Sequence, residues 1–439
     1  MQRKLVYAGT NEPSFAIASE QVAELMDLNV GAKQIERVTE RIGAERCRER
    51  DAEVERYMSL PLMERKGKPA DVTAPDVVAV GVDGGRYQLR RDADQPVRPS
   101  ADKSAAGASD AAPSVAAPPD ESENLPPDEK HRGTHWREDK IGVLMTMKSD
   151  VSAVDPCPEV PEAFVDPTRI LKLTRELKTK KSAAEEATHQ EAAKPADEPE
   201  EVEHVLKAEA QKVRWQPPEV QTKHLTATHQ SWATFGPMVA TLAWSLGFFQ
   251  AQRQAFVGDG SDNNWTLWRK HFSSFTPILD FIHAISYVFA AATAGCSFAV
   301  GWLYYERWVR WLWAGEIEKV IAEMAQRQAE LGAPQEGDGE THPRQVLATA
   351  LGYLQNHKEK MRYADYRRLG LPITSSYVES AVKQFNQRVK GTEKFWADHG
   401  IESVLQLRAD LKSDGAPMDA FWQRRQDNAT GQRNYTMAV

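Results

Sequence analysis

The sequence predicts an α/β fold, and three observations lead to that prediction. Residues 77–89 form a β-branched run typical of a strand, and a second strand-like run covers 140–150. Elsewhere, apolar residues recur at three- and four-residue spacing over long stretches, which indicates amphipathic helices. A chain of 439 residues has room for two or three domains around such a core.

The first predicted helices cover residues 14–58, with a short break at 29–31. Two helices around a Gly-containing turn are typical of a helix-turn-helix DNA-binding motif. An ordinary helical hairpin has the same pattern, and the residues alone do not separate the two interpretations.

The two predicted strands are expected to pair as a hairpin with a long insertion. Residues 91–133 are rich in Ala, Pro, Ser and Asp with scarcely an aromatic, so we expect them to be disordered. A surface loop absorbs such an insertion at low cost. Residues 177–212 form a second low-complexity stretch that is dense in charge. Beyond it we expect a helix over 232–252 and a short strand over 255–260.

Residues 278–331 have a helical pattern that is unusually rich in tryptophan. Within them, 284–305 carries no charge and is long enough to cross a bilayer. Small and polar residues dilute this run, and Glu306, Arg307 and Arg310 follow it without a loop. We therefore predict a buried helix in a large soluble domain, with a membrane span as the alternative.

Net charge, cysteine spacing and the N-terminus limit the kinds of site and compartment that fit this chain. The net charge of −8 gives no overall basic signature, so any nucleic-acid binding must come from local patches. The three cysteines, Cys47, Cys157 and Cys296, lie far apart without a CxxC pair, which fits a reducing compartment. The N-terminus lacks the apolar run of a signal peptide, and we expect a cytoplasmic protein.

A lone glutamate, Glu379, leads into an amphipathic helix. Lys383, Asn386 and Lys390 follow on its own face, beside a stripe of apolar residues. Ser376-x-x-Glu379 matches a capping box, in which both side chains would bond to N–H groups of the first turn. The helix therefore allows either a capping or a chemical role for this carboxylate.

Two aspartates complete a candidate set with Glu379. Asp83 and Asp259 each interrupt or end a strand-like run and precede a glycine, which is also the pattern of an ordinary Asp-Gly turn. Carboxylates from separate strands and a helix can form an oxygen-ligand cage for Mg²⁺. Two such ions about 4 Å apart can activate a hydroxyl group and stabilise the leaving oxygen of a phosphodiester. The basic helix face behind Glu379 would hold a DNA backbone beside them.

With these residues in place, the chain resembles a DDE transposase of the bacterial Kra-type insertion-sequence family, in the Mutator-like group. The resemblance covers most of residues 14–425 outside the two low-complexity tracts. The segments that carry it are VAVGVDGGRYQLR (78–90), HWREDKIGVLMTMKS (135–149), AFVGDGSDNNWTLWRKHFSSFTPILDFIHAISYVF (255–289) and RRLGLPITSSYVESAVKQFNQRVKGTEKFW (367–396).

The resemblance implies an RNase H-like mixed sheet flanked by helices, with a helical insertion domain before the glutamate and an N-terminal helical region. It implies that Asp83, Asp259 and Glu379 bind two Mg²⁺ or Mn²⁺ ions and catalyse strand cleavage and 3′-OH strand transfer. Asp280 and His283 match an Asp-x-x-His element that could orient a metal ligand or contact phosphate, or form a structural polar pair. The candidate DNA-binding residues are Lys383, Arg388, Lys390, Lys394 and Trp396. With Lys390 and Gly391, Trp396 matches the family's KG…W element, where it could stack on an unpaired base or be a core residue.

The expected partners are double-stranded DNA, at transposon ends and target, and further copies of the chain, with no membrane. The alternatives are a DNA-binding protein that no longer transposes and a membrane protein. The expected organisation is an N-terminal helical region (1–70), a core in parts (71–90, 134–176, 213–280 and 367–425), two low-complexity tracts (91–133 and 177–212), a helical insertion (281–366) and a tail (426–439).

Overall fold

The computed structural model describes residues 1–90, 136–175, 216–391 and 394–429. The expected insertion at 91–133 and the charged tract at 177–212 both lie outside the described residues.

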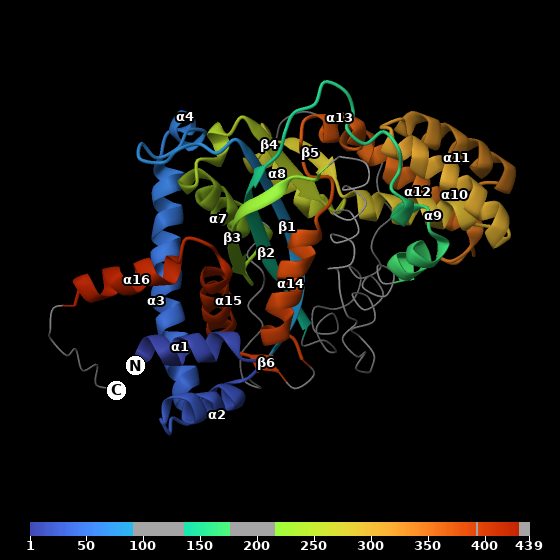
Figure 1. The fold of residues 1–439 in the computed structure, drawn as a ribbon. Coiled ribbons are helices and arrows are strands. Elements are labelled where there is room, and N and C mark those ends of the chain that lie inside the picture. The colour runs from blue at the N-terminus through green and yellow to red at the C-terminus, as the bar shows by residue number, and fades with distance from the viewer. Residues whose placement is uncertain (91–135, 176–215, 392–393, 430–439) are drawn as a thin grey trace, which may run out of the picture.

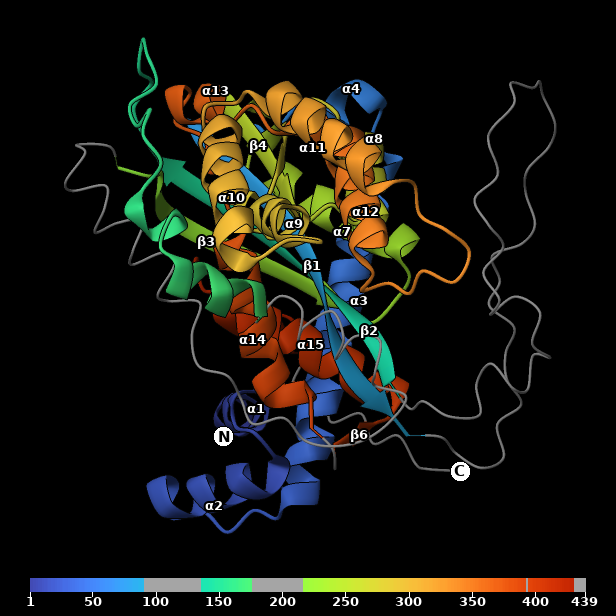
Figure 2. The ribbon, with the colours of Figure 1, turned by 90° about the vertical axis from the view of Figure 1, so that its right-hand side faces the viewer.

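A mixed sheet forms the centre of the molecule, with strand order β3-β2-β1-β4-β5 (Figure 1). The β3–β2 and β2–β1 pairs are antiparallel, and β4 and β5 continue the sheet parallel to β1. The two-residue strand β6 pairs with the far end of β1 (Figure 2). The strands are β1 (Val77–Leu89), β2 (Trp136–Lys148), β3 (Glu219–Thr228), β4 (Arg253–Gly258), β5 (Thr276–Leu279) and β6 (Phe395–Trp396).

The predicted hairpin of β1 and β2 and the strand before Asp259 are confirmed. β1 is central because its apolar start is buried on both faces. Two strands were missed. β3 has many polar residues and lies at the edge of the sheet, and β5 has only four residues, one of them Pro277. Such strands lack the continuous apolar run that predicts a buried strand.

Helices cover both faces of the sheet. Methyl groups added at Gly81 or Gly85 on β1 would meet side chains of α14 (Ser376–Val389), so the odd-numbered residues of this strand face that helix. On the opposite face, a methyl group at Gly142 would meet side chains of α7 (Trp232–Ser245). The helix α8 (Asp262–His271) packs beside β4.

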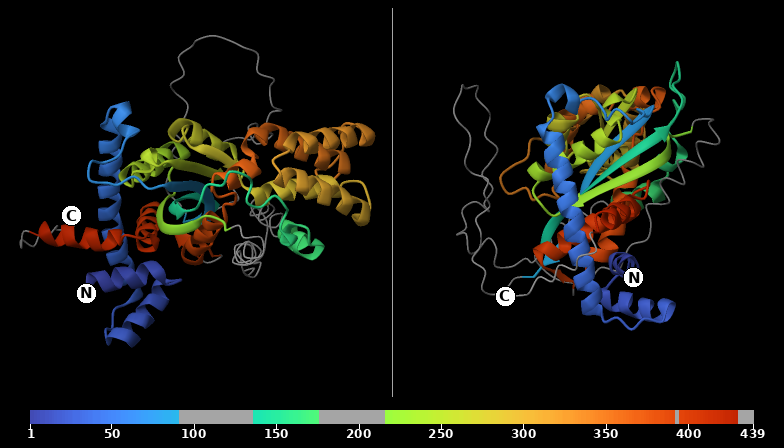
Figure 3. Two further views of the ribbon diagram at one scale, coloured as in Figure 1. Left: turned by 45° about the horizontal axis from the view of Figure 1, so that its top comes forward. Right: turned by 90° about the vertical axis from the view of Figure 1, so that its left-hand side faces the viewer.

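The N-terminal helices pack on this core. α3 (Ala32–Ser59) runs along the β3 side of the sheet (Figure 3) and contacts α7 and α15 (Asp398–Lys412). Arg46 Nε lies 2.9 Å from Asp410 of α15, and a methyl group at Gly43 would lie 2.5 Å from Ser403. The two helices predicted over 14–58 are confirmed as α2 (Phe15–Met26) and α3, preceded by α1 (Gln2–Asn11). The remaining N- and C-terminal helices are α4 (Leu62–Arg65) and α16 (Pro417–Asp427).

A group of helices projects from the opposite side of the sheet (Figures 1 and 2). The uncharged run at 284–305 is not one helix, because one helix ends at Thr293 and the next begins at Phe298, with Gly295 at φ +70° between them. The first of these helices is buried as predicted, whereas Phe298, Val300 and Leu303 in the second are 46%, 45% and 64% exposed, which corrects the prediction for that part of the run. No helix in the described ranges is both long and apolar enough to cross a membrane. This group comprises α9 (Phe281–Thr293), α10 (Phe298–Trp313), α11 (Ile317–Leu331) and α12 (Pro343–His357), followed by α13 (Tyr363–Arg368).

Candidate functional site

Asp83 lies on the central strand, on the face that α14 covers. Side chains alternate along a strand, so Asp83 points the same way as Gly81 and Gly85. At Gly81 a methyl group would lie 2.5 Å from Val378 Cγ2, so the missing side chain is what allows α14 to approach β1. The glycines therefore bring the helix that carries Glu379 against the strand that carries Asp83.

Asp259 lies beside Asp83 at the end of the neighbouring strand. Gly81 pairs with Val257 in the parallel register of β1 and β4, and two residues further along both strands are the two aspartates. Asp259 Oδ1 accepts hydrogen bonds from Ser261 N–H (2.9 Å) and Asn264 Nδ2 (2.8 Å). The predicted Asp-Gly turn is thus present, because these bonds fix the chain as it enters α8.

The turn at Asp259 is also held from the helical insertion. The hydroxyl of Tyr353, on α12, donates to the Asp259 carbonyl at 2.7 Å. The Tyr353 ring stacks on Tyr287 of α9, with centroids 3.7 Å apart. Gly260, at φ +97°, has no room for a side chain because a methyl group would lie 2.5 Å from the Tyr353 hydroxyl. Sequence reasoning missed Tyr353, because no local motif links it to a residue so distant in the chain.

Glu379 lies in the first turn of α14, but the capping-box alternative is wrong. The helix starts at Ser376, and its N-cap residue, Ser375, does not cap it with its side chain. Glu379 is therefore one position beyond the place that a capping box requires, and its N–H bonds to the Ser375 carbonyl at 3.2 Å. The apolar stripe beside it is buried as predicted: Val378, Val382, Phe385 and Val389.

Asp280 ties the start of α14 to the sheet. This residue follows β5, is 1% exposed, and caps α9 by accepting the His283 N–H at 2.9 Å. Its Oδ2 accepts both the backbone N–H and the hydroxyl of Ser375, the latter at 2.6 Å. Although burial alone would raise the pKa of Asp280, the interactions with His283 and Ser375 hold it below its usual value. Ser375 is a second site residue that the sequence did not reveal.

His283 adds a positive charge to this group. Its Nδ1 lies 3.4 Å from Asp280 Oδ1, an ion-pair distance without the geometry of a hydrogen bond. Burial would lower the pKa of His283, but Asp280, and then Asp259 and Glu379, raise it to about 9. The imidazole is therefore protonated at neutral pH.

The three predicted carboxylates interact electrostatically. Burial raises the pKa of Asp83 to about 7, and the charges of Asp259 and Glu379 add to this shift. The Gly84 N–H, which donates to Asp83 Oδ1 at 2.7 Å, and the charge of His283 oppose it. The structure thus brings these side chains into one electrostatic neighbourhood. Among the described residues, however, no three His, Cys, Asp or Glu side chains are already arranged to hold a metal ion.

Two of the candidate DNA-binding residues are buried, which corrects the prediction for them. Arg388 is 2% exposed, and its guanidinium donates to the Gly9 carbonyl at 3.0 Å and stacks against Phe15 and Trp396. Trp396 is 7% exposed and donates from Nε1 to the Val389 carbonyl at 2.9 Å. Both residues fasten α14 to the N-terminal helices, so the core alternative for Trp396 is the one the structure favours.

The three lysines remain at or near the surface. Lys390 is exposed, with Nζ 5.8 Å from the ring centre of Trp136. Lys383 is half-buried. Lys394 is also half-buried, and its Nζ donates to the Gln387 carbonyl at 3.1 Å near the end of α14.

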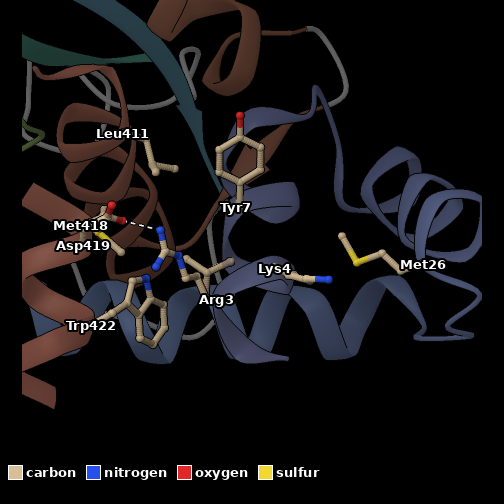
Figure 4. Close-up of a pocket in the computed structure, with 9 residues that line it drawn as sticks. Arg3, Lys4, Tyr7, Met26, Leu411, Met418, Asp419 and Trp422 are labelled. Atoms are coloured by element: carbon tan, nitrogen blue, oxygen red, sulfur yellow. Dashed lines mark hydrogen bonds and ion pairs between the residues drawn. The ribbon is translucent and has the colours of Figure 1, made fainter. Parts of the chain in front are cut away.

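A pocket of about 370 Å³ lies elsewhere, between α1, the end of α2, α15 and α16 (Figure 4). Tyr7, Leu411 and Trp422 contribute to its lining, and Arg3 forms an ion pair with Asp419 at 2.5 Å. Asp83, Asp259 and Glu379 do not line this pocket.

Comparison with known proteins gives no family for this chain. No family model matches the sequence, and none of the curated proteins matches it.

Proposed function

We propose that this chain is a DDE-type transposase with an RNase H-like core, which cleaves DNA at transposon ends and joins the 3′-OH to target DNA. The observation that carries the proposal is geometric: Asp83 and Asp259 lie at matching positions beyond the paired residues Gly81 and Val257, and α14, which carries Glu379, packs on β1 at Gly81. The charges of Asp259 and Glu379 both raise the pKa of Asp83, after the larger effect of burial. Carboxylates that are gathered at one place repel one another, and a bound cation would relieve this repulsion further than the charge of His283 does.

The fold supports this proposal. The carboxylates belong to the central strand, to the end of its parallel neighbour and to a helix that packs on β1 and β2, and a mixed sheet is the expected core. A helical group also lies between Asp259 and Glu379 in the sequence, as the resemblance implies. All three donors are hard oxygen ligands, the type that Mg²⁺ and Mn²⁺ prefer.

In this proposal Asp83, Asp259 and Glu379 would hold two divalent ions. Bound there, the ions would supply an activated water or 3′-hydroxyl and stabilise the leaving oxygen. Asp259 would contribute its carboxylate, of which Oδ1 already accepts two hydrogen bonds within the turn. The side chains would have to adjust to complete the cage, because the present arrangement does not form one. Tyr353 and Asp280 would limit that adjustment by fixing the backbone on both sides.

Lys383, one turn beyond Glu379 on α14, and Lys390, the residue that follows the helix, would position the DNA backbone beside the carboxylates. Transposition joins two DNA ends, so we expect further copies of the chain to assemble on DNA.

The test is strand cleavage by the purified protein on DNA that carries the sequences flanking its own gene. We expect Mg²⁺- or Mn²⁺-dependent nicks at fixed positions, and no nicks with the Asp259→Asn variant. DNA binding without nicks by the wild-type protein would instead support the DNA-binding alternative and refute the catalytic proposal.

A further inference from the structure

A further buried carboxylate, that of Asp139, lies next to the candidate site and has no part in the proposed chemistry. Asp139 on β2 is 0% exposed and pairs with Gly85 in the antiparallel register. It therefore lies on the same face of the sheet as Asp83, under α14. Neither of its carboxylate oxygens has a hydrogen-bond partner among the described residues.

A third unpartnered oxygen faces the same point. A methyl group on Gly85 would lie 2.7 and 3.0 Å from the two oxygens of Asp139, and 3.1 Å from Oδ1 of Asn386. Asn386 Oδ1 is also buried and without a partner in the described part of the chain. Asn386 belongs to α14, two turns beyond Glu379. These three oxygens are all hydrogen-bond acceptors, and they cannot bond to one another unless one of them carries a proton.

The surroundings do not neutralise an ionised Asp139. An ionised carboxylate that is buried without a partner costs several kcal/mol, so such groups take up a proton. Burial raises the pKa of Asp139 to about 7, partly opposed by its own N–H, by Lys140 and by Lys390, while the charge of Glu138 raises it further. Lys140 lies on the other face of the sheet, 3.4 Å from Glu138.

We propose that Asp139 is a neutral carboxylic acid that donates a hydrogen bond to Oδ1 of Asn386 and thereby fixes the register of α14 on the sheet. Asp139 is then a positioning residue, and its effect on Glu379 rests on the proposed function. Ionisation of Asp139 as the pH rises through neutrality would leave three acceptors facing one another without a proton and weaken the docking of α14. Tyr87 on β1, Glu138 and Lys140 on β2 and Lys390 on α14 are the other titratable groups around it.

The first experiment compares the Tm of the full chain and of Asp139→Asn between pH 4 and pH 8, without divalent ions or DNA. An asparagine still donates to Asn386 Oδ1 but cannot ionise. We expect similar Tm values at the lowest pH and a variant that is more stable at pH 8, by at least about 2 °C. Asp139→Leu, which cannot donate, should be less stable than Asp139→Asn at every pH.

The second experiment follows the docking of α14 by hydrogen exchange with mass spectrometry. After correction for intrinsic exchange rates, the protection of the α14 amides against exchange should fall in the wild type between pH 6 and pH 8. In Asp139→Asn it should stay constant. Neither measurement involves cleavage, so their outcome is independent of the transposase proposal. An Asp139→Asn variant that is less stable than the wild type at pH 8 would overturn the inference, because Asp139 would then be an ionised acceptor.

If the Asp139 variants do not fold, the protonation of the Asp139 carboxyl group can be tested directly. Infrared spectra of the Asp83→Asn protein, labelled at aspartate, should show a protonated carboxyl band that disappears near pH 7. Absence of this band at pH 6 would also overturn the inference.

Discussion

Ser375 donates both its backbone N–H and its hydroxyl to one carboxylate oxygen of Asp280. The residue before α14 is thereby fixed to the residue after β5. Glu379 lies one turn further along that helix, so this contact sets the position of the third carboxylate relative to the sheet.

The Ser375→Ala variant tests this contact. Asp280 Oδ2 would keep the backbone N–H but lose the hydroxyl, and the free energy of unfolding should fall by about 1–3 kcal/mol. Ser376→Ala is the matched control, because Ser376 caps nothing and should change stability by less than about 0.5 kcal/mol. Urea denaturation measures both. Equal effects of the two substitutions would show that the Ser375 contact does not hold α14.

The Glu379→Gln variant separates charge from shape. Since Glu379 does not close a capping box, the fold should lose little stability. The substitution removes a negative charge that hard divalent ions require, so strand cleavage should fall by orders of magnitude while DNA binding persists. Gel-shift and cleavage assays on the same DNA measure the two properties. Near-normal cleavage by this variant would rule out the three-carboxylate mechanism.

The Asp83→Asn variant should be more stable than the wild type in the absence of metal. The pKa of Asp83 is about 7 in the folded chain against 3.8 as its ordinary value. The unfolded chain loses this proton at lower pH, so rising pH between these two values destabilises the wild type. The Tm advantage of the variant should therefore be absent near pH 4, grow up to about pH 7 and then level off. A variant that is less stable at pH 8 would contradict the buried, repelled state of Asp83.

Tyr353→Phe tests the clamp on the Asp259 turn. The ring can still stack on Tyr287, but the hydrogen bond to the Asp259 carbonyl is lost, which should cost about 1 kcal/mol of stability. The rate of DNA cleavage should also fall, because the backbone of Asp259 is no longer held in one position. Tyr287→Phe preserves the same stack and is the control. If both variants cleave DNA equally well, Tyr353 has only a packing role.

The parts of the fold that were predictable from the sequence are those with strong local patterns. β1 and the helices α2, α3 and α14 have unbroken apolar periodicity, and Asp259 follows a short strand next to a glycine. The break at Gly295 was not predicted, because an uncharged run has the same composition whether it forms one helix or two.

The supporting contacts of the site could not be predicted, because they join residues that are far apart in the chain. Tyr353 and Asp259, or Ser375 and Asp280, meet only after the sheet and the helical group have formed. Arg388 and Trp396 show the opposite error. An arginine on a basic helix and the tryptophan of the KG…W element suggested contacts with DNA, whereas in the structure both residues pack α14 against the N-terminal segment.

The most direct test of the central claim is Mn²⁺ binding, followed by electron paramagnetic resonance, with the wild type and Asp83→Asn in the presence of flanking DNA. If Asp83, Asp259 and Glu379 form the metal site, the wild type should bind two Mn²⁺ ions per chain, and Asp83→Asn should lose that binding although it remains folded. Equal Mn²⁺ binding by the two proteins, or no binding by the wild type, would contradict the account.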